Sequence, residues 1–305
     1  GTGSLDAAAS QPLILVDGVE RAFTRMDPNE IESVTVLKDA SATAVFGVRG
    51  ANGVILVTTK RGKEGKTSIS LSSSVGVTQA MRLPEMANSY DHAFYHNEMM
   101  TNDGEDPLFG TDLIEAFRTN SDPIMFPNMN WKEEIFRKAS LQTQHNLNIS
   151  GGTDRIRTKA TFGYDRVEGL YENRSYERFT VRMNNDIKIN DFISGAFDVN
   201  VKRSYALSPV SDPMPAVYMA SPVYAAVWAD GRIADGKSGD NAYAALLYGG
   251  TTKQNYNQVG GKIALYITPL RGLKLSAIVA PTYNDSKTKK FTKRIEYYAA
   301  DDPLE

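Results

Sequence analysis

The sequence contains no cysteine among its 305 residues, which excludes a disulfide scaffold and a thiolate metal site. It has no run of about eighteen apolar residues, so no transmembrane helix is expected. The net charge is only -2, and nothing in the charge pattern indicates a nucleic-acid partner. A mean hydropathy of -0.35 still permits a membrane β-barrel, because its strands need only alternate residues apolar. The first ten residues, GTGSLDAAAS, lack a basic region and an apolar core, so the chain as given carries no signal peptide. We expect either a cytoplasmic protein or one whose true start is missing.

The first part of the chain, Pro12–Gly62, has the pattern of a compact α/β unit. The apolar run Leu13–Val16 predicts a strand buried on both faces, and Asp17-Gly18 predicts a hairpin turn. The capping box Asp27–Glu30, with proline at the first helical position, predicts a short helix before a strand at Ser33–Leu37. A unit of about fifty residues is small for independent stability, so we expect it to lean on something larger.

The stretch VLKDASATAVFGVRGANGVILVTTKRG places three glycines, spaced by three, between a helical and a β-branched segment. Asp39 is expected to cap a helix over Ala40–Phe46 that ends at Gly47, and a tight turn then leads into a buried strand at Val54–Thr59. Because these glycines close a helix, no helix N-terminus faces a phosphate, and nucleotide binding is disfavoured. The residues expected to fix the structure of this unit are Asp17, Gly18, Asp39, Gly47, Arg49, Gly50, Asn52 and Gly53.

From Lys66 onward the apolar pattern changes to a period of two over long segments. Between Glu177 and Ile189 one face is apolar and the other polar or charged, and the alternation recurs at 155–165, 193–201 and 259–267. Strands of about ten to thirteen residues exceed the usual length in globular sheets and match a tilted membrane crossing. Strand length therefore favours a barrel over a soluble all-β domain with one buried face per sheet.

The connections between these strands alternate in length. Long ones are expected near 79–141 and 206–255, a medium one at 167–176, and short turns at 151–154, 190–191 and 269–272. Short turns on one side and long loops on the other are typical of an outer-membrane barrel whose short side is periplasmic. Tyr164, Phe179 and Tyr205 lie on the apolar face at the long-loop end, as an interfacial girdle would. The opposite face is expected to line a wet lumen and contact a plug, through Arg155, Arg157, Lys159, Arg178 and Arg182.

Evidence for catalytic or metal chemistry is sparse. His92 and His96 have helical spacing for two metal ligands, but the intervening Glu of zincins is absent, so polar residues on a loop helix are the preferred interpretation. No nucleophile, base and orienting acid form a recognisable set, and we expect no enzyme activity, no metal and no cofactor. Aromatic residues in the 206–255 connection either stack against sugar rings or pack the loop, and packing is favoured. The candidates for substrate contact are Tyr224, Trp228, Tyr243 and Tyr248, with Tyr218 nearby.

Two stretches carry a family resemblance. PLILVDGVE with DPNEIESVTVLKDASATAVFGVRGANGVILVTTKRG strongly resembles the C-terminal half of the plug domain of SusC/RagA-like TonB-dependent outer-membrane transporters. The segment from DPIMFPNMNW to RMNNDIKI is similar to the first extracellular loop and following strands of the same family. The resemblance implies import of oligosaccharides or peptides across a Bacteroidetes-type outer membrane, through a barrel of about 22 strands with a plugged lumen. It further implies a SusD-like surface lipoprotein, TonB and outer-membrane lipid as partners.

The fold class expected is therefore an α+β plug fragment, residues 1–64, followed by an antiparallel, partial transmembrane β-barrel, residues 65–305, of seven to eight strands. Relative to the family, the signal peptide, the TonB-contacting segment, half of the plug and roughly two-thirds of the strands are missing. We expect a fragment of a longer polypeptide that is not a stable monomer, because an open sheet exposes its edges. A secreted β-rich glycan-binding module without transport is the alternative, and a passive porin is disfavoured by the α/β unit.

Overall fold

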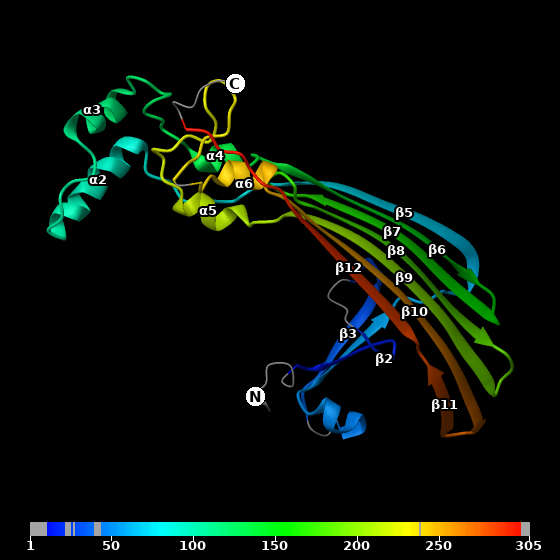
Figure 1. Cartoon of the computed structure of the whole chain (residues 1–305). Coiled ribbons are helices and arrows are strands. Elements are labelled where there is room, and N and C mark those ends of the chain that lie inside the picture. The colour runs from blue at the N-terminus through cyan, green and yellow to red at the C-terminus, as the bar shows by residue number, and fades with distance from the viewer. Residues whose placement is uncertain (1–10, 22–25, 27, 40–43, 238, 300–305) are drawn as a thin grey trace.

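The computed structural model describes residues 11–21, 26, 28–39, 44–237 and 239–299. Within them the chain forms a four-stranded sheet, called the small unit with its connecting turns, and an eight-stranded sheet, called the large sheet. The large sheet is curved and unclosed, and the small unit lies on its concave side (Figure 1). The helices gather at one end of the large sheet, where the long connections emerge.

The small unit has the strand order β2-β1-β4-β3, with β1 and β4 parallel and the other pairs antiparallel. Its strands are β1 (Leu13–Val16), β2 (Val19–Glu20), β3 (Ile31–Leu37) and β4 (Val54–Thr59). The predicted hairpin turn is confirmed, since Asp17 (φ 50°) and Gly18 (φ 80°) both have positive φ between β1 and β2. Val16, Val54 and Val57 form the buried centre, whereas the rest of β1 is only half-buried.

The helical segments of the small unit are 3-10 helix: η1 (Pro28–Glu30) is a single turn, and η2 (Ala44–Gly50) is two short turns on either side of a kink at Gly47. Residues 40–43 of the predicted helix, and Asp27 of the predicted capping box, lie outside the described residues. In the described part, residues 44–46 form a turn of 3-10 helix in place of the predicted α-helix. Gly47 (φ 60°, ψ -153°) ends that turn, so the prediction that the helical segment ends at Gly47 is confirmed. The tight turn before β4 is confirmed by a hydrogen bond from Gly53 N to Gly50 O at 2.9 Å.

The large sheet is antiparallel throughout and follows the chain in the order β5 to β10, with β11 and β12 both on the far edge of β10. Two strand bounds correct the sequence predictions, because the connection expected at 206–255 is shorter: β9 runs to Pro209 and β10 begins at Gly250. The strands are β5 (Gly65–Thr78), β6 (Ser140–Gly152), β7 (Ile156–Glu168), β8 (Ser175–Lys188), β9 (Ile193–Pro209), β10 (Gly250–Leu270), β11 (Leu273–Val279) and β12 (Thr282–Thr292).

The long connections fold into five helices, and three of them surround a hydrophobic core, here called the loop cluster. It contains the buried residues Trp131, Ile135, Tyr171, Val217, Ala226, Ala242 and Leu246. The helices are α2 (Ser89–Asn102), α3 (Thr111–Thr119), α4 (Trp131–Ile135), α5 (Pro213–Met219) and α6 (Ala242–Tyr248). Across the described residues, none of the helices has the length and apolar character needed to span a membrane.

The two faces of the large sheet differ, as the alternation in the sequence predicts. Residues directly opposite one another on neighbouring strands share a face. One such row on the convex face is Leu71, Leu147, Phe162, Val181, Val201, Val259 and Tyr283, and the next is Ile69, Ile149, Ala160, Met183 and Val199. Many of these side chains are exposed, so the convex face carries an apolar band, and the concave face carries the polar residues that meet the small unit.

Candidate functional site

The small unit meets the concave face of the large sheet through charged side chains, and Arg61 makes the densest contact. Its guanidinium donates to both carboxylate oxygens of Asp198 on β9, at 2.8 and 2.7 Å, and to Asp186 Oδ1 on β8 at 3.0 Å. Asp17 Oδ2 lies 3.9 Å from Arg61 Nη2. Burial alone lowers the pKa of Arg61, but the hydrogen bond to Asp198 and the charges of the surrounding carboxylates outweigh it and raise the pKa. Arg61 is therefore held as a cation between two strands.

The hairpin turn of the small unit makes a second contact. The Asp17 carboxylate accepts hydrogen bonds from Thr59 N at 2.9 Å and Thr59 Oγ1 at 2.6 Å, which joins β1 to the end of β4. Lys262 Nζ on β10 donates to the Asp17 carbonyl oxygen at 2.7 Å, and Asn184 Nδ2 on β8 donates to Thr59 Oγ1 at 3.2 Å. Thr59 and Asn184 are fully buried. A single turn thus depends on two strands of the large sheet.

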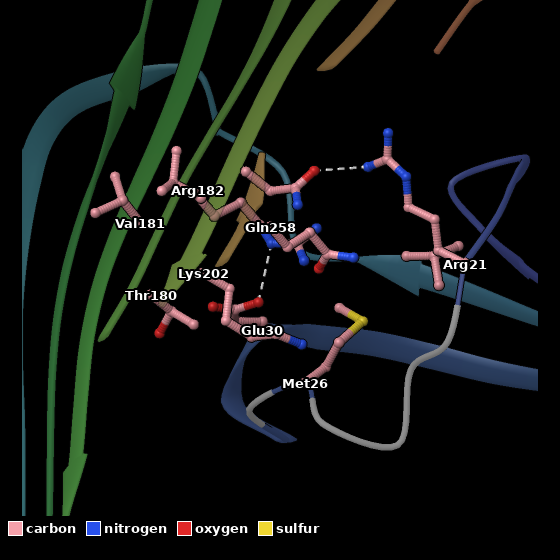
Figure 2. A pocket seen from close by; sticks show the side chains of 11 residues that line it. Arg21, Met26, Glu30, Thr180, Val181, Arg182, Lys202 and Gln258 are labelled. Atoms are coloured by element: carbon pink, nitrogen blue, oxygen red, sulfur yellow. Dashed lines mark hydrogen bonds and ion pairs between the residues drawn. The ribbon is translucent and has the colours of Figure 1, made fainter. Parts of the chain in front are cut away.

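A third contact surrounds a small cavity of about 40 Å³ between the small unit and strands β8 to β10 (Figure 2). Arg21 donates to Asn200 Oδ1 at 2.8 Å and to the carbonyl oxygen of Gly261 at 2.7 Å. Glu30 Oε2 lies 2.9 Å from Arg182 Nε, an ion pair whose N–H is not aligned for a hydrogen bond. Burial and the nearby Arg182 charge lower the pKa of Arg21, partly offset by Asp198 and Asp17. The cavity has room for about one water molecule and none for a nutrient.

Close backbone approach fixes the chain where it passes from the small unit into the large sheet. A Cβ added at Gly62 would lie 2.6 Å from the backbone nitrogen and oxygen of Thr158 on β7. Such a distance is far below van der Waals contact, so this position requires glycine. A few residues later, Arg157 and Glu64 form an exposed ion pair at 3.4 Å.

A larger cavity of about 480 Å³ opens beside the end of β4, toward strands β5 to β7. Lys60, Arg61, Lys63 and Lys159 supply most of its charge, with Glu32 as the acidic residue. Serine and asparagine side chains of the large sheet complete the lining. The concave side of the sheet is therefore lined by polar and charged side chains on this flank of the small unit.

The charged residues predicted to face the lumen have different partners. Arg182 contacts the small unit through Glu30, and Arg157 contacts it through Glu64. Lys159 lines the cavity next to Lys60. Arg178 instead pairs with Asp165 on the neighbouring strand at 2.7 Å. Arg155 lies in the turn before β7 and lines a separate cavity at the short-turn end of the sheet. The prediction of contact with the small unit is thus confirmed for Arg157 and Arg182.

Of the residues predicted to fix the structure of the small unit, only some lie close to one another. Asp17 and Gly18 form the turn that docks on the large sheet. Gly53 (φ 96°) closes the turn into β4, and a Cβ added to it would lie against the Leu37 carbonyl oxygen. Arg49 pairs with Glu20 at the exposed surface of the unit. Gly50 is buried and precedes the turn that contains Asn52. Asp39 is described, but the helix that it was predicted to cap begins at residues outside the described set.

The aromatic candidates of the 206–255 connection do not form one patch. Trp228 donates its indole N–H to the Tyr298 carbonyl oxygen at 2.7 Å, and Tyr243 packs against the loop cluster. Tyr248 is 47% exposed. Tyr224 lines a cavity of about 210 Å³ together with His92, His96, Phe109 and Trp131. Tyr224 and Tyr248 thus remain accessible for a ligand, and Trp228 and Tyr243 are occupied in packing.

The two histidines at helical spacing lie on α2. His92 Nε2 and Ser221 Oγ are 2.8 Å apart, and the ring of Phe109 packs edge-on against both imidazoles. Burial, with His96 and Lys237 nearby, lowers the pKa of His92. Among the described residues, no three His, Cys, Asp or Glu side chains gather as metal ligands. His92 therefore connects α2 to the α5–α6 connection through Ser221.

Sequence reasoning did not single out several of the residues that dock the small unit: Arg21, Glu30, Arg61, Asp186, Asp198 and Lys262. A signal for some of them was present, since Asp186, Asp198 and Lys262 occupy the polar alternate positions of otherwise apolar strands. Charge at such positions faces the lumen, where it requires a partner of opposite sign. Nothing in the sequence indicated which residue of the small unit supplies it.

Comparison with known proteins gives a consistent set of similarities. The family model "TonB-dependent Receptor Plug Domain" matches residues 1–54. The TonB-dependent receptor SusC of Bacteroides thetaiotaomicron is 32% identical over 193 residues, 60% of this chain and 18% of that protein. The TonB-dependent receptor P3 of Formosa agariphila is 33% identical over 182 residues, 60% of this chain and 16% of that protein. A solved structure of the RagAB peptide transporter superposes with a TM-score of 0.75 at 22% identity, covering 94% of this chain and 36% of that chain. The chain thus spans about a fifth of the length of these curated relatives.

Proposed function

We propose that this chain, which belongs to the SusC/RagA-like TonB-dependent receptors, is the gate-bearing part of an outer-membrane transporter. In this proposal residues 1–64 belong to a plug, and residues 65–305 form barrel strands and their long loops. One observation carries it: the small unit is seated by ion pairs on the polar concave face of a curved sheet whose convex face is apolar and exposed. A wet inner face and a lipid-compatible outer face together suit a plugged barrel.

The interface chemistry suits a gate that has to move. Arg61, Asp186 and Asp198 lose their partners when the small unit leaves the sheet, but each then becomes accessible to water, which replaces much of the lost interaction. An apolar interface has no such substitute, because separation exposes its whole surface to water. TonB, pulling on the plug, is the proposed source of the work that breaks these contacts.

The proposed cargo is an oligosaccharide or a peptide, entering at the end of the sheet that carries helices α2 to α6. A SusD-like surface lipoprotein is the proposed partner over those loops, and outer-membrane lipid surrounds the apolar band. Tyr224, Trp228, Tyr243 and Tyr248 are the proposed substrate contacts. Tyr224 and Tyr248 are the stronger candidates, since the other two have packing partners.

The alternatives are less well supported. A secreted glycan-binding module requires a closed core with short strands, whereas β10 has 21 residues and Val259, Ile263 and Leu265 on its convex side are exposed. A passive porin leaves the charged interface of the small unit without a role.

A reversible cross-link tests the gating proposal in the complete polypeptide that contains this chain. Thr59→Cys and Asn184→Cys replace two side chains that are hydrogen-bonded across the interface at 3.2 Å. This chain has no cysteine of its own, so the pair introduces the disulfide selectively. Oxidation is expected to abolish uptake of glycans and peptides in whole cells, and reduction is expected to restore it.

A matched control cross-links two strands of the large sheet instead. Ala160→Cys with Met183→Cys joins directly opposite positions on the convex face of β7 and β8, away from the small unit. This pair is expected to leave uptake unchanged under oxidation. Normal uptake with the Thr59–Asn184 pair fully oxidised would contradict gating by the small unit.

A further inference from the structure

The convex face of the large sheet carries a group of cations directly beyond the apolar band, on the long-loop side. These residues, here called the cation row, are Arg203 on β9, Lys253 on β10, and Lys287 and Lys289 on β12, and all four are exposed. Arg203 lies directly opposite Phe179 of β8, one step beyond the Val181–Val201 pair of the apolar band. The cation row is therefore continuous with the apolar surface.

The strand register brings these cations together on one face. Lys253 is paired directly with Lys289, and Asn255 is paired with Lys287 on one side and Tyr205 on the other. Side chains of directly opposite residues are about 5 Å apart at Cβ, and like charges in such a position destabilise the sheet. An anion bound between the two lysines removes this repulsion.

The carboxylates on the same face do not balance the row. Glu168 and Glu177 both pair with Arg166, at 2.6 and 2.9 Å, farther along the sheet. Asp285 lies 3.8 Å from Lys287. With Arg166 included, five cations thus face three carboxylates, and the region has a net positive charge in a protein whose net charge is -2.

The other boundary of the apolar band is different. Toward the short turns, the paired positions of the convex face hold Ile156, Ile187, Leu265, Ile267 and Leu275, and no Lys, Arg, Asp or Glu occurs at the convex positions of these described strand pairs. Only the long-loop boundary is charged. General solubility does not explain a difference between two boundaries of one band.

We propose that the cation row binds the phosphate groups of anionic lipids in the membrane leaflet at the long-loop end. This inference rests on the proposed function, since it requires the apolar band to lie in a bilayer. Lipid phosphates occur at the level where the hydrocarbon ends, which is where the row begins. The Arg203 guanidinium stacks 4.8 Å from the Tyr205 ring centroid, which holds it at this level beside an amphipathic ring.

The test compares two substitutions on one strand pair in the complete polypeptide, purified in neutral detergent. Lys253→Gln with Lys289→Gln removes the opposed lysines, and Lys290→Gln is the matched control, because Lys290 is the next residue of β12 and points to the other face. Phosphatidic acid, phosphatidylcholine and inorganic phosphate are the probes, and lipid bound per protein is measured by native mass spectrometry. Heat-modifiable electrophoretic mobility confirms that each variant is folded.

The wild type is expected to retain phosphatidic acid over phosphatidylcholine, and inorganic phosphate is expected not to displace it. A cation at a membrane surface contributes about fivefold in affinity, so the double variant should lose about twenty-five-fold while the control retains wild-type binding. Equal retention by the double variant, or equal binding of the two lipids, would overturn the proposal. If the wild type instead binds no lipid and stays monodisperse without detergent, both this proposal and membrane insertion are wrong.

Discussion

The small unit and the loop cluster both join distant parts of the chain, but they do so with opposite chemistry. The small unit is fixed to the large sheet by ion pairs and hydrogen bonds around Arg61, Asp17 and Glu30. The loop cluster is fixed by apolar burial around Trp131 and Val217, which are 3% and 0% exposed. Under the proposed gating, the charged interface is the one that separates and rebinds, and the apolar cluster is the one that stays assembled.

Two single-cysteine reporters make this comparison measurable, because the chain has no cysteine. Val16→Cys lines the small cavity between the small unit and the sheet, so its thiol is labelled only when the small unit moves away. Val217→Cys lies at the centre of the loop cluster and reports opening there. Both changes are close to volume-conserving, and labelling rates convert into free energies of local opening.

The largest expected effect is on the loop cluster. Trp131→Ala removes a buried indole and its hydrogen bond to the Ser221 carbonyl oxygen at 3.0 Å. A loss of about 4 kcal/mol is expected, which raises the labelling rate of Val217→Cys by about a thousandfold. Labelling of Val16→Cys is expected to stay unchanged. A parallel rise at both reporters would show that the two regions open as one.

The next effect is on the interface. Asp198→Ala removes the carboxylate that binds Arg61 and lies 3.9 Å from Lys262, and so leaves the half-buried Arg61 and the buried Lys262 without it. The free energy of opening at Val16→Cys should fall by about 3 kcal/mol. Asp191→Ala is the control, since this exposed residue pairs with Lys188 at the short-turn end, and it should change neither reporter.

A smaller loss is expected from Thr59→Val. The substitution keeps the shape of the side chain but removes the hydroxyl that donates to Asp17 and accepts from Asn184. The free energy of opening reported by Val16→Cys is expected to fall by about 1 to 2 kcal/mol, because the polar groups of Asp17 and Asn184 lose their buried partner. Thr58→Val, at the exposed neighbouring position of β4, should have no effect. Equal effects of the two variants would assign the loss to strand propensity.

The smallest effect is a pH dependence of the loop cluster. The pKa of His92 is lowered in the folded protein by burial and by His96 and Lys237, so the unfolded chain binds the proton more readily. The contribution of His92 to stability is therefore present above its ordinary pKa of about 6.5 and is lost as the pH falls below that value. The free energy of opening at Val217→Cys, taken from labelling rates divided by the rate of an exposed thiol at the same pH, should fall as the pH is lowered from about 7 to about 5, and His92→Gln should flatten this dependence.

Local chemistry made much of the fold predictable from the sequence. Asp17-Gly18 allows positive φ at both turn positions, and the period-two pattern between Glu177 and Ile189 predicts both faces of β8. The type of the helical segment before Gly47 was the error in the small unit, since residues 44–46 form 3-10 helix, whereas the end of the segment at Gly47 followed from the positive φ that glycine allows. The start of β10 at Gly250 was missed, since its first residues, TTKQN, are polar on both faces.

The candidate site was less predictable, for a physical reason. Arg61 and Asp198 are 137 residues apart and meet only when the small unit docks on the sheet. Sequence alternation identifies Asp198 as a lumen-facing charge but carries no information on its partner. The aromatic residues of the loops show the same limit, since Trp228 and Tyr224 have similar sequence surroundings but one bonds Tyr298 and the other lines a cavity.

The central claim, that specific charge pairs hold the small unit in place, is tested most directly by a double-mutant cycle. Arg61→Gln, Asp198→Asn and the double variant are each measured through the labelling rate of Val16→Cys in the complete polypeptide. A coupling free energy of about 2 kcal/mol or more is predicted, because the pair is bidentate and largely buried. Additive effects, within about 0.5 kcal/mol, would contradict the account.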